Sequence, residues 1–544
     1  MIVDVFAITT QMSNISLTPA ILQLPNEILD AIASLLTDPQ RLQVMEGIGL
    51  TTTLRPLIFH WPRSSIAARF THGRRDLCRL ALVCRRFHQI AERLLYVHIS
   101  LPHPEGAGTT GLFRYPWIAL PYLVRTLLER PDLAARITSL DLWIRDRRLI
   151  ADNDELDLSL RSPYYSMFKA ACDRLSREQA TFSERVNWSK ELYQYQEAAL
   201  HAFVITLLPQ LRDLKLYAPV AQRKQFLWHG TGDRPQFPVV TPIYSYFDVA
   251  LRNSSLTTLY VGVPFPIKSF PTASLQSMEI DMFFFGDRLD WLTSPTILPN
   301  VKSVTAMINL PLLNGNKYAV CFPDLDPRIG LQIFLRDMVP NIEKFAALPP
   351  RGTFPHCPGH VDKRGLPLPE GISLFQDVQD MDVNPMFDPS NDRGDWDWLL
   401  EPLQPVRQRL RSLVLPQNWH SATGNVKPVP SFRHFRCLES LFVPKVAVVA
   451  NPHGEGYDVV EHGKVAVDVL PRSLKSLGIT QVDTKTCKWV QDAFDQKERF
   501  PHLEQVELVF EDDFAAVLSC GFEEAARKAG VEVKVRWRGE SMLL

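Results

Sequence analysis

The chain has 544 residues, of which 46% are hydrophobic and 22% are charged, so its length and composition are those of a globular protein with several domains. Its formal net charge of -1 excludes a general electrostatic attraction to nucleic acids or to anionic membranes. No apolar run reaches the length of about 18 residues that a membrane-spanning helix needs. Neither a membrane nor a nucleic acid is therefore a predicted partner.

The eight cysteines are scattered along the chain, and none forms the Cys-x-x-Cys pair that is typical of metal and redox sites. Their density is far below that of a disulfide-rich scaffold, which predicts reduced thiols in a cytoplasmic or nuclear protein. The first residues lack a basic segment, and Asp4 interrupts their apolar run, so we expect no signal peptide.

The first predicted element is an amphipathic helix in the segment ILQLPNEILDAIASLL. Leu24 and Pro25 lie at its entry, where proline is favourable. One helical face then carries the apolar residues Ile28, Leu29, Ile32, Leu35 and Leu36. We expect the helix to end before Pro39, because the residue before a proline disfavours helical backbone.

A second amphipathic segment reads DLCRLALVCRRFHQIAERLLYVHI. Its apolar face comprises Leu77, Leu80, Cys84, Phe87, Ala91, Leu94 and Leu95. Arginines occupy the other faces. Short helices of this kind cannot bury their apolar surface alone, so they need either the rest of the protein or a partner.

Together these two segments resemble an F-box, in the form common among fungal F-box proteins. A Leu-Pro-x-Glu-Ile start, a Leu-Val-Cys-Arg-x-Phe centre and a Leu-Tyr-x-x-Ile end stand in the family's order. The family usually has only a few residues between the two halves, whereas this chain has an insertion at about 38–74. We therefore place the F-box at 20–100, after an N-terminal tail at 1–19.

The resemblance implies a three-helix module that binds the Skp-type linker protein of an SCF-type cullin-RING ubiquitin ligase and, through it, a cullin. The residues predicted to bind this partner are Leu24, Pro25, Ile28, Leu29, Ile32, Leu82, Val83, Cys84 and Phe87. The alternative is that these residues only close a local core. Eight arginines between positions 63 and 93 would give the surface a basic rim that steers an acidic partner, or else a solvated face.

The segment LVRTLLERPDLAARITSLDLWI predicts a helix, a turn and a strand, and a similar phrase then recurs along the chain. It has an apolar residue, two polar ones, an apolar residue, one variable residue and an apolar residue. The copies lie at 207–218, 254–263, 273–282, 298–308, 339–348, 408–416, 435–444, 471–480 and 500–510. The alternation predicts a short strand with one buried face, and the segments between several copies predict helices.

This pattern resembles a degenerate leucine-rich repeat, whose units stack into a curved solenoid with parallel strands on the concave side. The predicted fold class is therefore α/β: a small helical F-box followed by an irregular leucine-rich-repeat-like solenoid at 110–544. A non-repetitive α/β domain is the alternative. A Pro- and Asp-rich insertion is predicted at about 349–405, where a solvated segment is favoured over a partner-binding loop.

The sequence offers few candidates for chemistry. His356, Cys357 and His360 have metal-like spacing, but tetrahedral zinc needs four ligands, so no metal is predicted. Cys84 lies beside arginines that would favour a reactive thiolate, although its place on the apolar face favours a packed thiol. No nucleotide-binding or hydrolase motif occurs.

The leading hypothesis is a non-catalytic adaptor without a cofactor, which holds an unknown substrate protein on the repeat domain for ubiquitin transfer. One alternative is a scaffold that carries an F-box-like module outside a ligase. Another is an enzyme built on the α/β domain, which a deep pocket with convergent polar groups would favour.

Overall fold

The computed structural model describes two compact units, Met1–Ile99 and Ser100–Leu544, which we call the N-terminal and C-terminal units. The described residues are 77–101, 119–144, 197–217, 245–252, 254–262, 270–281, 296–307, 327–348, 396–415, 428–449, 465–510 and 520–537, with Leu29, Ala33, Trp188 and Leu192.

In the N-terminal unit, the second amphipathic segment forms two helices. Residues 77–81 are helical, and α7 spans Arg85–Leu95. Between them the backbone N–H groups of Leu82 and Val83 bond back to Arg79 and Leu80, at 3.1 Å each. Cys84, the residue before α7, has extended backbone, which separates the two helices.

The sheet has twelve strands in chain order, and every neighbouring pair from β2 to β12 is parallel. The strands are β1 (His98–Ser100), β2 (Ser139–Trp143), β3 (Asp213–Tyr217), β4 (Thr258–Gly262), β5 (Ser277–Asp281), β6 (Ser303–Met307), β7 (Lys344–Leu348), β8 (Ser412–Val414), β9 (Ser440–Pro444), β10 (Ser476–Thr480), β11 (Gln505–Phe510) and β12 (Glu532–Trp537). The sheet is open, and its strand order never departs from the order of the sequence.

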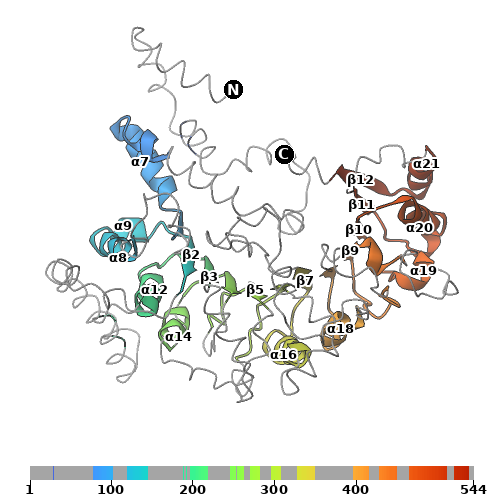
Figure 1. Ribbon diagram of the computed structural model, residues 1–544, viewed down its shortest axis with the longest axis horizontal. Helices are drawn as coiled ribbons and strands as arrows, with labels where there is room; N and C mark the ends of the chain where they lie inside the picture. Colours follow the sequence, from blue (N-terminus) through green and yellow to red (C-terminus); the bar gives the residue numbers. More distant parts are fainter. Residues whose placement is uncertain are drawn as a thin grey trace, which may run out of the picture. The chain divides into compact units, whose positions relative to one another are not determined.

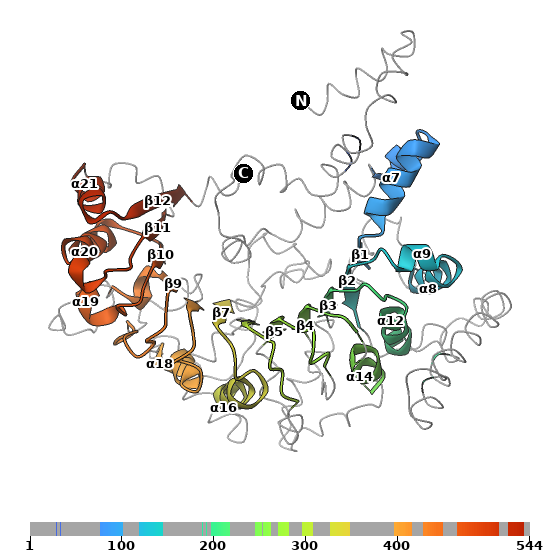
Figure 2. The same ribbon diagram turned by 180° about the vertical axis from the view of Figure 1, so that it is seen from behind.

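The helices of the C-terminal unit lie along one face of this sheet, as both ribbon views show (Figure 1, Figure 2). The longer segments are α8 (Ala119–Glu129), α9 (Pro131–Ala134), α12 (Glu197–Thr206), α14 (Ser245–Arg252), α16 (Pro327–Ile333) with the π-helix η8 (Phe334–Met338), α20 (Thr484–Asp495) and α21 (Cys520–Ala529). The shorter ones are α18 (Asp397–Leu400), η10 (Glu401–Leu403), η11 (Lys445–Ala447), α19 (Ala466–Val469) and η12 (Lys497–Arg499).

Each of the nine copies of the repeated phrase contains one strand, from β3 to β11, so the prediction of strands there is confirmed. In one copy, the apolar positions are Leu438, Leu441 and Val443, and each is 0% exposed. The same positions in the next two copies are at most 1% exposed: Leu474, Leu477 and Ile479, then Leu503, Val506 and Leu508. The phrase therefore marks the residues that each strand turns into the core.

Backbone hydrogen bonds join each turn to the one before it. The N–H groups of Lys475 and Ser476 both donate to the carbonyl of Glu439, at 2.7 and 2.9 Å. One copy further on, Glu504 and Gln505 donate in the same way to Lys475. The same bonds recur from copy to copy and extend the pairing of the strands into the turns. The start of each strand is thereby hydrogen-bonded to the turn before the preceding strand.

The α/β class and the open parallel sheet of the fold prediction are thus confirmed, whereas the predicted domain boundaries stay predictions. The tail at 1–19 and the insertion at 38–74 lie outside the described residues, as do residues 349–395. The described end of the second predicted insertion, residues 396–405, contains α18 and η10, and Trp396 there is 0% exposed.

Gly478 in β10 faces its register partner Phe442 in β9 at close range. A Cβ atom at Gly478 would lie 1.9 Å from Cδ2 of Phe442. We expect Gly478→Ala to lower the free energy of unfolding by about 1–3 kcal/mol, because the ring must move within a packed region. Urea unfolding followed by circular dichroism measures this loss.

The side chain of Phe442 provides the control for this prediction. In a Phe442→Ala background, Gly478→Ala should cost at least about 1 kcal/mol less than in the wild type, because the clash is gone. Ser476→Ala, on the same face of β10, should change stability by less than about 0.5 kcal/mol. Strictly additive effects of the two substitutions at 442 and 478 would contradict the close contact.

Glu507 in β11 is a carboxylate that the fold buries, with 1% of its surface exposed. Its Oε1 lies 3.0 Å from Nε of Arg536 in β12. Burial raises the pKa of Glu507 above its usual value of 4.5, and the charges of Arg536 and Lys534 only partly oppose this rise. The folded state therefore holds the proton more tightly than the unfolded state does.

The contribution of Glu507 to stability should consequently be complete below pH 4.5 and be lost as the pH rises through the raised pKa. Glu507→Gln cannot lose a proton, so its stability relative to the wild type should increase between about pH 4 and about pH 8. Urea unfolding across this range measures the difference. Exposed Glu498→Gln serves as the control, and a difference that stays constant with pH would contradict the raised pKa.

Candidate docking surface

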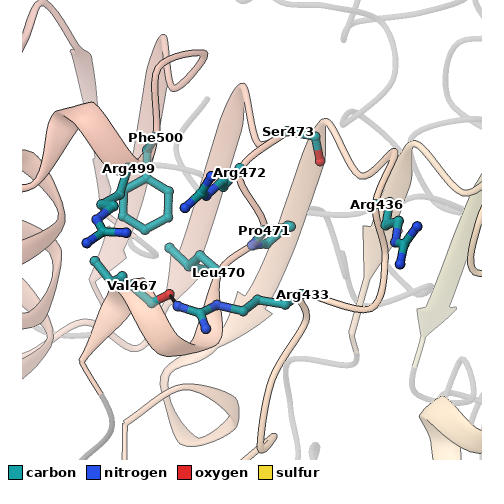
Figure 3. Close-up of a pocket in the computed structure, with 9 residues that line it drawn as sticks. All are labelled: Arg433, Arg436, Val467, Leu470, Pro471, Arg472, Ser473, Arg499 and Phe500. Carbon is teal, nitrogen blue, oxygen red and sulfur yellow. Dashed lines mark hydrogen bonds between the residues drawn. The ribbon is translucent and has the colours of Figure 1, made fainter.

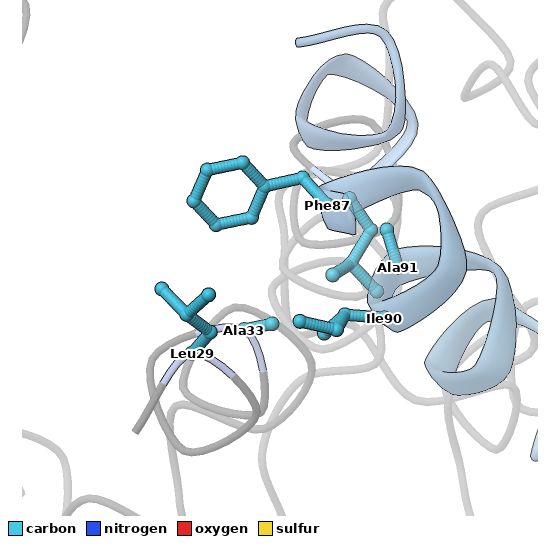
Figure 4. Packing of buried hydrophobic residues seen from close by; sticks show 6 residues of the cluster. Leu29, Ala33, Phe87, Ile90 and Ala91 are labelled. Carbon is cyan, nitrogen blue, oxygen red and sulfur yellow. The ribbon is translucent and has the colours of Figure 1, made fainter. Parts of the chain in front are cut away.

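The N-terminal unit has a small apolar core built from two distant segments of the chain. Leu29 and Ala33, which are helical and 0% exposed, pack against Phe87, Ile90 and Ala91 of α7 (Figure 4). Leu77 completes the buried cluster, and the partly buried Leu80, Ala81, Cys84, Leu94 and Leu95 pack against it. The two segments that the sequence separates by a long insertion therefore share one core.

The turn between the two helices presents two adjacent apolar side chains to solvent. Leu82 is 86% exposed and Val83 is 66% exposed, the largest fractions among the exposed large hydrophobic residues in the described part of the chain. Burying such a side chain stabilises a protein by about 1.5–3 kcal/mol, and here that gain is not realised within the unit. Single exposed apolar residues are ordinary, but a pair at the tip of a hydrogen-bonded turn is a typical anchor for a partner.

His88 contacts both of the helices that flank this turn. Its Nδ1 lies 3.3 Å from the carbonyl oxygen of Ala81, the last residue of the preceding helix. Its Nε2 lies 3.9 Å from Oε1 of Glu92, one turn further along α7. The ring thus links the end of one helix to the start of the next.

Basic residues flank the exposed pair on both sides. Arg79 precedes the turn and Arg85 follows it, and both side chains are exposed. Half-buried Arg86 and exposed Arg93 extend the positive charge along α7. An apolar tip with a positive rim complements a partner surface that is apolar at its centre and acidic around it.

A family model described as F-box-like matches residues 70–102, the stretch that contains the exposed turn and α7. The chain contains an F-box-like domain. No curated protein matches the chain. The match omits residues 24–36, the first half of the F-box pattern in the sequence, but Leu29 and Ala33 from that half pack into the same core.

The predicted partner-binding residues take different places in the F-box-like domain. Leu82 and Val83 are exposed at the turn, and Cys84 is half-buried against the core. Leu29 and Phe87, at 0% and 5% exposure, lie inside the core. The remaining predicted residues, Leu24, Pro25, Ile28 and Ile32, lie outside the described residues. Binding by any of the nine residues stays a prediction.

Sequence reasoning missed two buried residues of this core, Ala33 and Ile90, which are 0% and 7% exposed. Ala33 follows Leu29 by four residues and Ile90 follows Phe87 by three, so the helical period contained the signal for both. A turn at Leu82 and Val83 interrupts the helical period of positions 77–95, which the apolar pattern did not indicate.

The described residues contain neither a metal-binding cluster nor a membrane-spanning helix. No group of three or more His, Cys, Asp or Glu side chains there is arranged to hold a metal ion. The sequence candidate at His356, Cys357 and His360 lies outside the described residues. Within the described chain, no helix has both the length and the apolar character needed to cross a bilayer.

The different burial of Phe87 and Leu82 leads to a prediction about the F-box-like domain. Phe87→Ala should destabilise the domain by about 3–5 kcal/mol, because it opens a cavity in the core. Leu82→Ala should change its stability by less than about 0.5 kcal/mol. Hydrogen–deuterium exchange of peptides from α7 measures both effects in the full chain. Equal protection losses in the two variants would contradict the exposed placement of Leu82.

Proposed function

We propose that the protein is the substrate-recognition adaptor of an SCF-type cullin-RING ubiquitin ligase. The F-box-like domain docks a Skp-type linker protein and through it a cullin, and the C-terminal unit holds a substrate protein. The observation that carries this proposal is the exposed pair Leu82 and Val83 on a fixed turn, within the residues that the F-box-like model matches.

The docking step follows from the physical character of this turn. Leu82 and Val83 enter an apolar pocket of the linker, where the partner removes them from water. Leu29 and Phe87 support the turn from the core, and Cys84 packs between the core and the tip. The exposed Arg79 and Arg85 surround the anchor and speed the encounter with an acidic partner.

The C-terminal unit acts in this proposal as a leucine-rich-repeat-like solenoid, similar to the repeat domains of fungal F-box proteins. Its parallel strands stack in chain order, and its helices cover one face of the sheet (Figure 1). Such stacking leaves extended surfaces that bind protein segments. The adaptor then acts by proximity, because it raises the effective concentration of the substrate at the ligase, and no residue of the chain performs chemistry.

Binding to a purified Skp-type linker protein tests the proposal. The double variant Leu82→Asp and Val83→Asp should weaken binding of the full chain at least about tenfold, because charges replace the apolar anchor. Ile297→Asp is the matched control, since Ile297 is an exposed apolar residue of the C-terminal unit, at 59% exposure. It should leave the affinity unchanged.

Two outcomes would count against the adaptor role. Wild-type affinity in the double variant would overturn the assignment of the turn as the docking site. Failure of the linker-bound chain to recruit a cullin would overturn the ligase role even if the linker binds. Recruitment of a cullin by the wild-type complex, and its loss in the double variant, would support both steps.

A further inference from the structure

The sheet of the C-terminal unit ends on a strand that is paired on one side only. All six residues of β12 pair with β11, with Val533 opposite Val506 and Val535 opposite Leu508. In the part of the chain that the structure describes, no strand pairs with the opposite edge of β12 (Figure 1). β12 is therefore an edge strand of ordinary length.

The burial of one apolar row shows what this edge lacks. The row is 0% exposed in β9, β10 and β11, where Val506 and Leu508 are its members in β11. Their register partners in β12, Val533 and Val535, are only half-buried. In a stacked repeat each unit covers the one before it, and no unit follows β12 among the described residues. One more strand beside β12 would cover both valines.

The free edge also presents backbone hydrogen-bonding groups. The N–H of Glu532 donates to the carbonyl of Glu504, in the turn before β11, at 2.8 Å. Because successive residues of a strand direct their backbone groups to opposite sides, those of Val533 and Val535 point away from β11. Their N–H and C=O groups have no hydrogen-bond partner among the described residues. Such an edge is a template for a further strand.

The opposite face of β12 is charged, and its two ends differ in sign. Glu532 stands at the start of the strand, and Lys534 and Arg536 follow it. Nζ of Lys534 lies 3.5 Å from Oε1 of Glu532, and Nε of Arg536 lies 3.0 Å from Oε1 of Glu507 in β11. Two copies of this strand place like charges opposite each other when they run parallel, and unlike charges when they run antiparallel.

We infer that β12 pairs antiparallel with β12 of a second copy of this chain, so that the two sheets become continuous across a two-fold axis. Glu532 of each copy then lies opposite the partner's Arg536, and Val533 lies opposite the partner's Val535. In this register the outward N–H and C=O groups of both valines bond to the partner strand. Lys534 faces its counterpart at the axis, and its own ion pair with Glu532 offsets part of that repulsion.

The order of charges favours a second copy over an unrelated strand. Lysine in an edge strand discourages association with arbitrary strands. A register shifted by two residues toward the end of β12 places Lys534 opposite Arg536, so it repels. A two-fold contact repeats each favourable pair, which gives two Glu–Arg pairs in the register of the inference. β12 is thus complementary to itself in one antiparallel register.

Sedimentation equilibrium of the full chain tests the inference. A contact of one strand on each side is small, so we expect a reversible dimer of micromolar affinity. The average mass should rise from that of the monomer toward that of the dimer between about 0.1 and 100 μM chain. The measurement is made without a linker protein, so its outcome is independent of the adaptor role.

A proline variant assigns the dimer to the edge of β12. Val535→Pro removes an N–H that points away from β11, so it leaves the bonds between β12 and β11 in place. It should raise the dissociation constant at least about tenfold, because the added ring blocks pairing with a partner strand. Val535→Thr keeps the N–H and the branched shape, so this matched control should form the dimer within about threefold of the wild type.

Charge reversal tests the antiparallel register. Glu532→Lys and Arg536→Glu should each weaken self-association at least about fivefold, because each places like charges opposite each other. An equal mixture of the two variants should form a heterodimer with nearly wild-type affinity, since every opposed pair is then of unlike charge. Glu498→Lys, at an exposed position outside β12, is the control and should leave self-association unchanged.

Four results would overturn the inference. The first three are a wild-type chain that stays monomeric at every concentration, a wild-type dissociation constant for Val535→Pro, and no recovery in the mixture of charge variants. A monomeric wild type would leave the edge to a strand of a different protein. The fourth is a dimer that forms only after residues 538–544 are deleted, because that segment of the same chain would then be the occupant of the edge.

Discussion

The register between neighbouring parallel strands is the constraint on which the C-terminal unit depends. Leu441, Leu477 and Val506 form one row across three strands, and all are 0% exposed. A slip of one residue would turn such a row to the opposite face of the sheet and expose it. The paired backbone bonds of each turn, such as those from Lys475 and Ser476 to Glu439, hold the next strand against that slip.

The same register decides which polar residues meet. Arg436 and Arg472 belong to different copies of the repeat and take equivalent places on adjacent turns, because their strands pair with Ser440 opposite Ser476. Both residues line one cavity, on separate turns (Figure 3). A ladder of strands thus converts one position of the phrase into a row of side chains along an edge. This property lets arginines from separate turns line one cavity without any basic run in the sequence.

The F-box-like domain depends on a different constraint, namely a core too small to cover all of its apolar residues. Leu29 and Phe87 fill that core, and Cys84 packs against it. At the turn beside His88, Leu82 and Val83 are exposed to water. A partner that covers these two side chains gains the free energy of burying them. Interior packing and the exposed anchor are therefore two results of the same local fold.

The sequence by itself determined the strands, their buried positions and the α/β class, because alternation between apolar and polar residues is a local signal. It also determined the F-box-like segment, through the order of short motifs around Leu82. Only the tertiary structure decided that Leu82 and Val83 are exposed whereas Phe87 is buried, since a helical period does not report a turn that interrupts it. It alone also gathered Arg436, Arg472 and Arg499 around one cavity, because contacts between separate repeats follow from strand register, which no local pattern encodes.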